Sequence, residues 1–350
     1  MLYSTPNPHG GDLYSRKICL DFSANINPYG TPEAVRQAVI DSVSDLRHYP
    51  DPYCRELVTA ISEFEEVGKE KILCGNGAAE LIFSFCRSLG PKKALILDPC
   101  FSEYETALRA SACEVAHFAL KKEEDFQLKR DFLPVLECFD GEALMLCNPN
   151  NPTGQIISRE MLEEILTICE RRKMFLFIDE CFLDLTDGGD CLTMKPYLQT
   201  HQNLFLLKAF TKSYGMAGLR LGYCLCGNAP LLRTMGQTVQ PWNVSVPAQK
   251  AGVAALKQTA FLEKAKQTIR EQRAALTGGL RELGLRVIGS HTNYILFYSD
   301  RELREPLLEK GIQIRSCANY PGLEAGWYRI AVKLPRENET LLAALKEILR

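Results

Sequence analysis

Short apolar runs of strand length alternate with amphipathic helical stretches through the middle of this chain. The runs cover residues 71–74, 94–97, 114–118, 143–147, 174–178, 203–207 and 221–226, and helical periodicity marks residues 78–87, 103–110 and 158–172 between them. Strands that are apolar on both faces and separated by helices are typical of a parallel sheet with helices on each side. We therefore predict an α/β fold, with a large domain built on a mainly parallel seven-stranded sheet.

The flanking segments have a different pattern. Helical stretches at residues 32–46 and up to 65 precede the sheet, and a long helical segment, 246–283, follows it as a connector. The tail alternates short strands with helices, which is typical of a smaller α+β domain. We predict an N-terminal arm and part of the small domain in residues 1–45, the large domain in 46–270 and the small C-terminal domain in 271–350.

Composition excludes several classes of partner. The net charge is −2 and no basic run is present, so nucleic acid and anionic membranes are not expected ligands. No apolar run reaches membrane-spanning length and residues 1–14 have no export-signal pattern, so we expect a cytoplasmic protein. The 14 cysteines include no Cys-x-x-Cys pair and no clustered histidines, which predicts buried thiols and no metal site.

Ligands of such sheets bind beyond the carboxyl ends of the strands, and two loops there are suited to a phosphorylated aromatic ligand. The turn at Gly75, Asn76 and Gly77 leads directly into a helix, whose first amides can hold a phosphate. In the next loop Phe101 could lie flat on a pyridine ring. A simple tight turn and a packing phenylalanine remain the alternatives.

Two further loops carry polar side chains. The segment 148–154, Asn-Pro-Asn-Asn-Pro-Thr-Gly, is a rigid loop whose amides can donate to an oxygen anion, although it could be a plain double turn. Asp179 follows another buried strand, where a carboxylate is costly unless it is paired. Its partner could be a protonated pyridine nitrogen or a structural Arg or Lys.

Lys212 follows the strand run 203–207 and stands among small and hydroxylated residues, eight positions before Arg220. Nearby positive charge and partial burial would lower the pKa of this amine and make it a nucleophile for a carbonyl cofactor such as pyridoxal phosphate, as a Schiff base. A solvated loop lysine is the alternative for this residue taken alone.

The order and spacing of these motifs resemble the fold-type I pyridoxal-phosphate enzymes, which have the aspartate aminotransferase fold, and among them the histidinol-phosphate aminotransferase branch. The resemblance spans nearly the whole chain. It implies that Lys212 binds the cofactor covalently, that Asp179 pairs with the pyridine nitrogen, that Asn151 donates to the ring phenolate and that Phe101 stacks on the ring.

The same resemblance implies further roles. The cofactor phosphate would be held by Gly77, Ala78, Thr211 and Arg220, and by Tyr49 from the second subunit of a homodimer with shared active sites. Arg329 would bind the substrate carboxylate through its guanidinium fork.

Two positions depart from the family pattern. Phe182 stands where a tyrosine usually donates to the phenolate, and Ala209 stands where a hydroxyl often contacts the phosphate.

The N-terminal segment is similar to the subgroup of threonine-phosphate decarboxylases of cobalamin biosynthesis. That similarity lies in His9-Gly10-Gly11-Asp12 and in residues 20–30, Leu-Asp-Phe-Ser-Ala-Asn-Ile-Asn-Pro-Tyr-Gly. It implies decarboxylation of L-threonine O-3-phosphate to an aminopropanol phosphate, a small phosphorylated amino acid being the substrate. An imidazole beside uncovered amides suits a phosphate monoester. The implied substrate residues are His9, Gly10, Gly11, Asn25, Asn27, Arg315 and Arg329.

Two alternatives stay open on the sequence alone. Histidinol-phosphate aminotransferase shares the catalytic residues, and serine phosphate differs from threonine phosphate by one methyl group, which is discriminated by only roughly 1–3 kcal/mol. A pyridoxal-binding regulator would need an added DNA-binding unit, for which no residues are left over.

Overall fold

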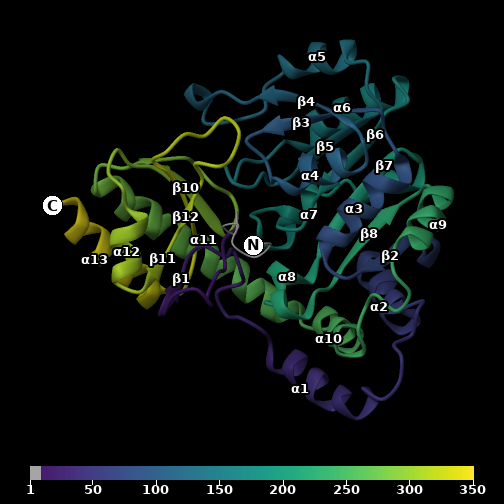
Figure 1. The fold of residues 1–350 in the computed structure, drawn as a ribbon, viewed down its shortest axis with the longest axis horizontal. Helices are drawn as coiled ribbons and strands as arrows, with labels where there is room; N and C mark the ends of the chain where they lie inside the picture. The colour runs from purple at the N-terminus through teal and green to yellow at the C-terminus, as the bar shows by residue number, and fades with distance from the viewer. Residues whose placement is uncertain (1–8) are drawn as a thin grey trace.

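A seven-stranded sheet forms the centre of the protein in the computed structural model, which describes residues 9–350 (Figure 1). The strand order is β2-β8-β7-β6-β5-β3-β4, and all neighbours are parallel except β8, which is antiparallel to β2 and β7. The predicted α/β fold with a mainly parallel sheet is confirmed. The strands are β2 (Ile72–Gly75), β3 (Lys93–Asp98), β4 (Glu114–Ala119), β5 (Ala143–Cys147), β6 (Phe175–Asp179), β7 (Leu204–Ala209) and β8 (Gly222–Cys226).

Both faces of this sheet are buried, except along the edge strand β4, and alternate residues of the other strands enter two separate cores. In β5, Leu144 and Leu146 belong to one core, and Ala143, Met145 and Cys147 to the other. Apolar residues of α2 (Arg55–Glu65), α5 (Phe132–Cys138), α6 (Arg159–Arg171) and α10 (Val246–Leu256) enter the first core, and those of α3 (Ala78–Leu89), α4 (Glu103–Ala110) and α9 (Ala229–Thr238) enter the second. This is why the runs are apolar throughout instead of alternating with polar residues.

The cysteines follow the same pattern. Cys224 and Cys226, two residues apart in β8, both lie in the second core, on the face shared with α3 and α9. All 14 cysteines lie among the described residues and are free thiols. Within residues 9–350, no group of His, Cys, Asp and Glu side chains could hold a metal ion.

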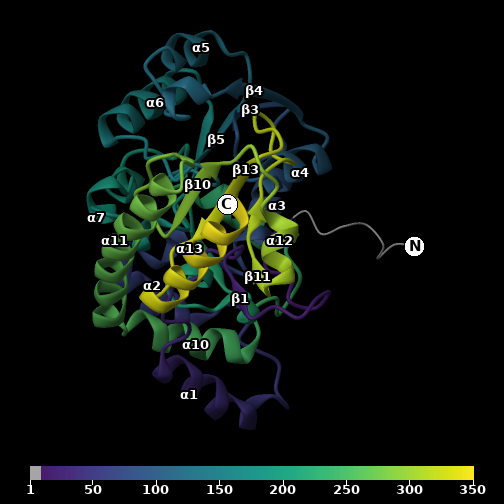
Figure 2. The same ribbon diagram turned by 90° about the vertical axis from the view of Figure 1, so that its left-hand side faces the viewer.

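A smaller antiparallel sheet, of order β12-β13-β10-β9, forms a second unit, which lies beside the large sheet in Figure 1 and in front of it in Figure 2. Its own core includes Phe22, Ile295, Phe297 and Ile330. Leu20–Asp21 (β1) pairs in parallel with Ile312–Gln313 (β11), so the start of the chain joins the small unit. The remaining elements here are β9 (Arg286–Val287), β10 (Tyr294–Tyr298), β12 (Arg315–Ser316), β13 (Trp327–Ala331), α11 (Thr259–Glu282), α12 (Arg304–Glu309) and α13 (Pro335–Leu349).

The structure corrects the predicted helical connector 246–283. It is two helices, α10 and α11, separated at Lys257 and Gln258. Helix α10 packs on α2 and on α1 (Glu33–Asp41) and belongs to the large unit. No proline or glycine lies at this break, so the sequence pattern predicted one continuous helix across it. Domain boundaries at residues 45 and 270 stay a proposal.

The carboxyl ends of β3, β5, β6 and β7 meet at the edge of the large sheet that faces the small unit. Two short helices, α7 (Gly189–Leu192) and α8 (Phe210–Ser213), follow β6 and β7. No helix among residues 9–350 is both long enough and apolar enough to cross a lipid bilayer. Because ligands of parallel sheets bind beyond the carboxyl ends of the strands, the functional site is expected at the edge where β3, β5, β6 and β7 end.

Candidate active site

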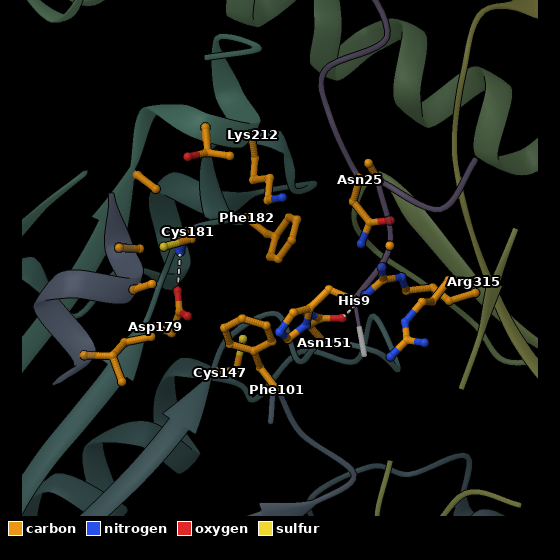
Figure 3. A pocket seen from close by; sticks show the side chains of 18 of the residues that line it. His9, Asn25, Phe101, Cys147, Asn151, Asp179, Cys181, Phe182, Lys212 and Arg315 are labelled. Atoms are coloured by element: carbon orange, nitrogen blue, oxygen red, sulfur yellow. Dashed lines mark hydrogen bonds between the residues drawn. The ribbon is translucent and has the colours of Figure 1, made fainter. Parts of the chain in front are cut away.

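A cavity of about 990 Å³, counting its opening to solvent, lies between the two units (Figure 3). Loops after the strands of the large sheet supply one wall, and the N-terminal segment and the small unit supply the other. Clefts between two structural units are a preferred place for small-molecule sites. Its predicted lining residues are His9, Gly10, Asn25, Ala78, Phe101, Asn151, Asp179, Thr211, Lys212, Arg220, Arg315 and Arg329.

Lys212 reaches into this cavity from α8, a single helical turn after β7. Burial and the positive charges of Arg329 and Arg220 lower the pKa of Lys212 to about 8, although Cys181 and Asp179 oppose the shift. A larger fraction of neutral amine near physiological pH is what a lysine nucleophile needs. The direction and cause of the shift agree with the prediction from sequence.

Asp179 ends β6 on the same side of the cavity. Its carboxylate accepts hydrogen bonds from the Tyr104 hydroxyl at 2.7 Å and from the Cys181 amide at 2.9 Å. Burial raises the pKa of Asp179, and these two donors and the charge of Lys212 only partly offset it. In the described part of the chain no Lys, Arg or His forms an ion pair with Asp179, so a cationic ligand fits it better than the structural-salt-bridge alternative does.

The turn between β2 and α3 forms a cradle for an anion. Gly77 is the N-cap of α3 with φ +82°, and a Cβ there would lie 2.6 Å from Nη2 of Arg220. Ala78 and Thr211 line the cavity beside that guanidinium. A helix N-terminus together with an arginine can hold a phosphate, and Gly77 does not line the cavity itself.

Asn151 and Arg329 meet across the cavity. Arg329 donates to Oδ1 of Asn151 and, at 2.9 Å, to the carbonyl of Ser23. Because the Asn151 carbonyl is engaged, its amide nitrogen remains to donate to a ligand, as a phenolate requires. Nε of Arg329 and Oδ1 of Asn25 are buried without a hydrogen-bond partner, which indicates a polar ligand here.

The N-terminal segment crosses the opposite side of the cavity, where Figure 3 shows Asn25, His9 and Arg315 together. His9 Nε2 lies 3.0 Å from a carboxylate oxygen of Glu103. Arg315 donates to the Ser316 carbonyl and to Asn319, and its guanidinium lies over the Tyr320 ring. The cavity therefore has a second cationic and polar region away from Lys212.

The structure does not bring every predicted residue to the cavity. Asn27 does not line the cavity; its side chain donates to the Ser213 carbonyl and accepts from the Tyr29 amide, and its role in substrate binding stays a prediction. Gly11 does not line the cavity either; its amide donates to Ser23. Tyr49 is 78% exposed and stacks on Trp242, and its predicted role in the site of a second subunit stays a prediction.

Sequence reasoning missed several lining residues, among them Tyr104, Tyr320 and Ser23. Helical spacing could have found Tyr104, which lies three positions after Phe101 at the start of α4. The two departures from the family pattern also line the cavity. Phe182 places its ring 5.7 Å from Nζ of Lys212 and has no hydroxyl to donate, and Ala209 likewise offers none.

These donors fit pyridoxal phosphate. Asp179 matches a protonated pyridine nitrogen, the Phe101 ring is placed at the cavity, and the Gly77 turn with Arg220 matches the phosphate. Lys212 matches the aldehyde carbon, and the Asn151 amide matches the phenolate oxygen. Each group of the cofactor has a residue of suitable chemistry.

Comparisons with known proteins agree with this arrangement. The family model for class I and II aminotransferases matches residues 17–345. Threonine-phosphate decarboxylase of Salmonella typhimurium is 37% identical over 97% of this chain and 96% of its own length, and histidinol-phosphate aminotransferase of Desulfitobacterium hafniense is 34% identical over 95% and 92%.

Among solved structures, that of the histidinol-phosphate aminotransferase from Clostridium acetobutylicum is similar with a TM-score of 0.88 and 30% identity, covering 94% of this chain and 99% of that one. The chain therefore belongs to the class I and II aminotransferase family, which confirms the predicted fold type and pyridoxal 5'-phosphate as the cofactor.

Proposed function

We propose that this protein removes carbon dioxide from L-threonine O-3-phosphate and forms (R)-1-amino-2-propanol phosphate for cobalamin biosynthesis. The observation that carries the proposal is the entry of His9, Gly10 and Asn25 into the cavity of Lys212 and Asp179. The decarboxylase relative is also the more similar of the two kinds of relative, at 37% against 34% identity.

Pyridoxal phosphate, when bound, supplies an electron sink for the bond that breaks at the substrate Cα. Asp179 would keep the pyridine nitrogen protonated, and the Gly77 turn and Arg220 would hold the phosphate. Lys212 Nζ, with its pKa near 8, can give the proton that replaces the lost carboxylate on Cα.

The reaction depends on which bond at Cα stands perpendicular to the conjugated ring. Decarboxylation requires the carboxylate in that position, whereas amino transfer requires the hydrogen there. Arg329 would hold the carboxylate, and His9, Asn25 and Arg315 would hold the substrate phosphate. The relative placement of these two anion sites would then select carbon dioxide release.

Amino transfer to or from a phosphorylated amino acid, as in histidinol-phosphate aminotransferase, is the second candidate. It is favoured by the 34% identical relative and by the similar solved structure. Serine phosphate is a further candidate substrate, since the two phosphoamino acids differ by one methyl group.

We further propose a homodimer in which each subunit completes the other's site. Tyr49 and Trp242 are 78% and 46% exposed and stack on each other at 4.4 Å, away from the cavity of their own chain. Large exposed aromatic residues are typical of contact surfaces.

Carboxyl-labelled threonine phosphate tests the proposed reaction. The wild-type protein loaded with pyridoxal phosphate should release labelled carbon dioxide, and Lys212→Ala should release none above background. Full activity in Lys212→Ala would exclude this lysine as the cofactor-binding residue.

The N-terminal segment has its own test. Because His9 lies among the proposed substrate-phosphate residues, His9→Ala should raise KM for threonine phosphate about tenfold while cofactor affinity stays unchanged. His201→Ala is the matched control, since His201 also contacts a glutamate, Glu170, at 2.9 Å but does not line the cavity. An unchanged KM in His9→Ala would count against this role.

A further inference from the structure

The turn that carries Lys212 cannot hold its own shape. Helix α8 has only four residues, Phe210–Ser213. Forming a first helical turn is unfavourable in isolation, so a helix this short depends on contacts from outside. The contacts that hold α8 therefore decide where Nζ of Lys212 points.

One contact comes from Asp184, in the single-turn segment Leu183–Leu185 that follows β6. The hydroxyl of Ser213, directly after Lys212, donates to Oδ2 of Asp184 at 2.9 Å. Ser213 is fully buried, and the Asp184 side chain is 25% exposed. A hydrogen bond to a charged acceptor at such a site is stronger than one between neutral groups.

Asp184 also lies near the ammonium group of Lys208, which has two further carboxylates around it. We call these four residues the Lys208 cluster: Glu65, Glu180, Asp184 and Lys208. Lys208 Nζ lies 3.4 Å from Glu65, 3.4 Å from Glu180 and 3.9 Å from Asp184. Glu180 also accepts from the Thr193 hydroxyl at 2.8 Å and the Met194 amide at 2.9 Å. Buried carboxylates with this many partners are fixed in place.

The three carboxylates of the cluster keep Lys208 protonated. Burial alone would lower the pKa of Lys208, but the three carboxylates around it outweigh burial and raise it. Lys208 precedes Lys212 by four residues, and its neighbour Ala209 lines the cavity. The cluster is thus joined to the reactive lysine both through β7 and through Ser213.

A second contact comes from Asn27. Its backbone amide donates to the Lys212 carbonyl at 3.0 Å, and its Nδ2 donates to the Ser213 carbonyl at 2.8 Å. Its Oδ1 accepts from the Tyr29 amide at 3.0 Å. The side-chain amide is therefore committed to the backbone of the turn.

We propose that Asp184 and Asn27 are positioning residues that together fix the turn Phe210–Ser213 and thereby the direction of Lys212. Asp184 acts on the Ser213 side chain and Asn27 on the carbonyls of Lys212 and Ser213. This inference rests on the proposed role of Lys212, but not on whether the enzyme decarboxylates or transfers an amine.

Cofactor-free protein tests the proposal without any substrate. The rate at which added pyridoxal phosphate links to Lys212 is followed by absorbance, and binding of pyridoxine phosphate, which has no aldehyde and cannot link, is measured separately. Asp184→Asn, Ser213→Ala and Asn27→Ser should each slow the link about 5- to 10-fold while pyridoxine phosphate binds as in the wild type. Since Asp184 and Ser213 share one contact, their double variant should be no slower than the worse single variant.

Asp187→Asn is the matched control. Asp187 lies three residues from Asp184, is 29% exposed and pairs with Arg270 and Arg273, and does not line the cavity. The Asp187→Asn variant should link pyridoxal phosphate to Lys212 at the wild-type rate.

Three outcomes would overturn the inference. These are wild-type link rates in Asp184→Asn and Ser213→Ala, an equal loss of pyridoxine phosphate binding, and equal slowing in Asp187→Asn. Ser213→Ala removes one oxygen atom, and its melting temperature checks that it folds. A wild-type protein that forms no link at all would instead contradict the proposed role of Lys212 itself, and the inference with it.

Discussion

Two of the three arginines that line the cavity, Arg329 and Arg220, shape the reactivity of Lys212. Burial first, and then the charges of Arg329 and Arg220, disfavour its ammonium form, which is why its pKa falls to about 8. The neutral amine is the nucleophile, so the shift acts directly on cofactor capture.

This shift predicts the pH dependence of capture. Below about pH 8 the amine is mostly protonated and unreactive, and above it mostly neutral, so the rate at which cofactor-free protein links pyridoxal phosphate should rise with pH through about 8 and then level off. Arg329→Met removes a positive charge and should move the midpoint to higher pH. A midpoint near the ordinary lysine value of about 10.4 would contradict this account.

Tyr104 is a side-chain donor to Asp179. Tyr104→Phe removes a 2.7 Å hydrogen bond and should raise the pKa of Asp179 further, which weakens its pairing with the pyridine nitrogen. We expect cofactor affinity to fall about 3- to 10-fold, measured by equilibrium titration. Tyr197→Phe is the control, because Tyr197 donates to Glu163 outside the cavity. Equal losses in both variants would show a general effect on folding.

At the residue scale, sequence located the cavity groups whose chemistry is distinctive, namely Lys212, Asp179, Asn151 and Arg329. It could not separate Asn25 from Asn27. Two residues apart in an extended segment, they would share a face. The chain turns between them, since the Ile26 amide donates to the Ala24 carbonyl, and only Asn25 lines the cavity.

At the element scale, the turn between β2 and α3 must leave room for Arg220. Gly77→Ala would place a methyl group 2.6 Å from the guanidinium at a positive φ, so it should displace Arg220 and reduce pyridoxal phosphate affinity about tenfold or more. Gly90→Ala is the matched control, because Gly90 ends the same helix at positive φ with no atom within 4 Å. Both variants should lose some stability, but only Gly77→Ala should lose cofactor affinity; equal affinities would argue against the cradle.

Most strands of the large sheet could be predicted because burial on both faces makes them mainly apolar, and the edge strand β4 is the exception. All seven predicted runs overlap an observed strand. The segment 312–315 was less predictable: β11 pairs with β1 and β12 pairs with β13, so one short segment serves two sheets. Pairing partners distant in the sequence decide this, and local pattern does not record them.

At the scale of the whole molecule, the proposed shared sites predict complementation between two defective chains. If Tyr49 acts in the partner's site, mixing and refolding Lys212→Ala with Tyr49→Ala should restore up to about a quarter of wild-type activity, because half of the dimers are mixed and each has one intact site. Light scattering should give twice the 39.3 kDa chain mass. No recovery from the mixture would place Tyr49 outside the active site.

The helix-covered sheet and the smaller second unit were predictable from the sequence, but the way in which the N-terminal segment connects to the small unit was not. The N-terminal segment reaches the cavity because β1 pairs with β11 and Phe22 enters the core of the small unit. The two residues of β1 are too few to show a strand pattern in the sequence. The resemblance to known enzymes is what placed this segment at the cavity, and His9, Gly10 and Asn25 do line it, whereas Gly11 and Asn27 do not.

A single assay can distinguish decarboxylation from amino transfer in this active site. Loaded enzyme is given carboxyl-labelled threonine phosphate and 2-oxoglutarate together, and labelled carbon dioxide and glutamate are measured in the same sample. If the enzyme is a decarboxylase, carbon dioxide and aminopropanol phosphate should form in equal amounts, with glutamate no higher than in the Lys212→Ala control. Glutamate formation with the label retained on the substrate carbon skeleton would contradict decarboxylation.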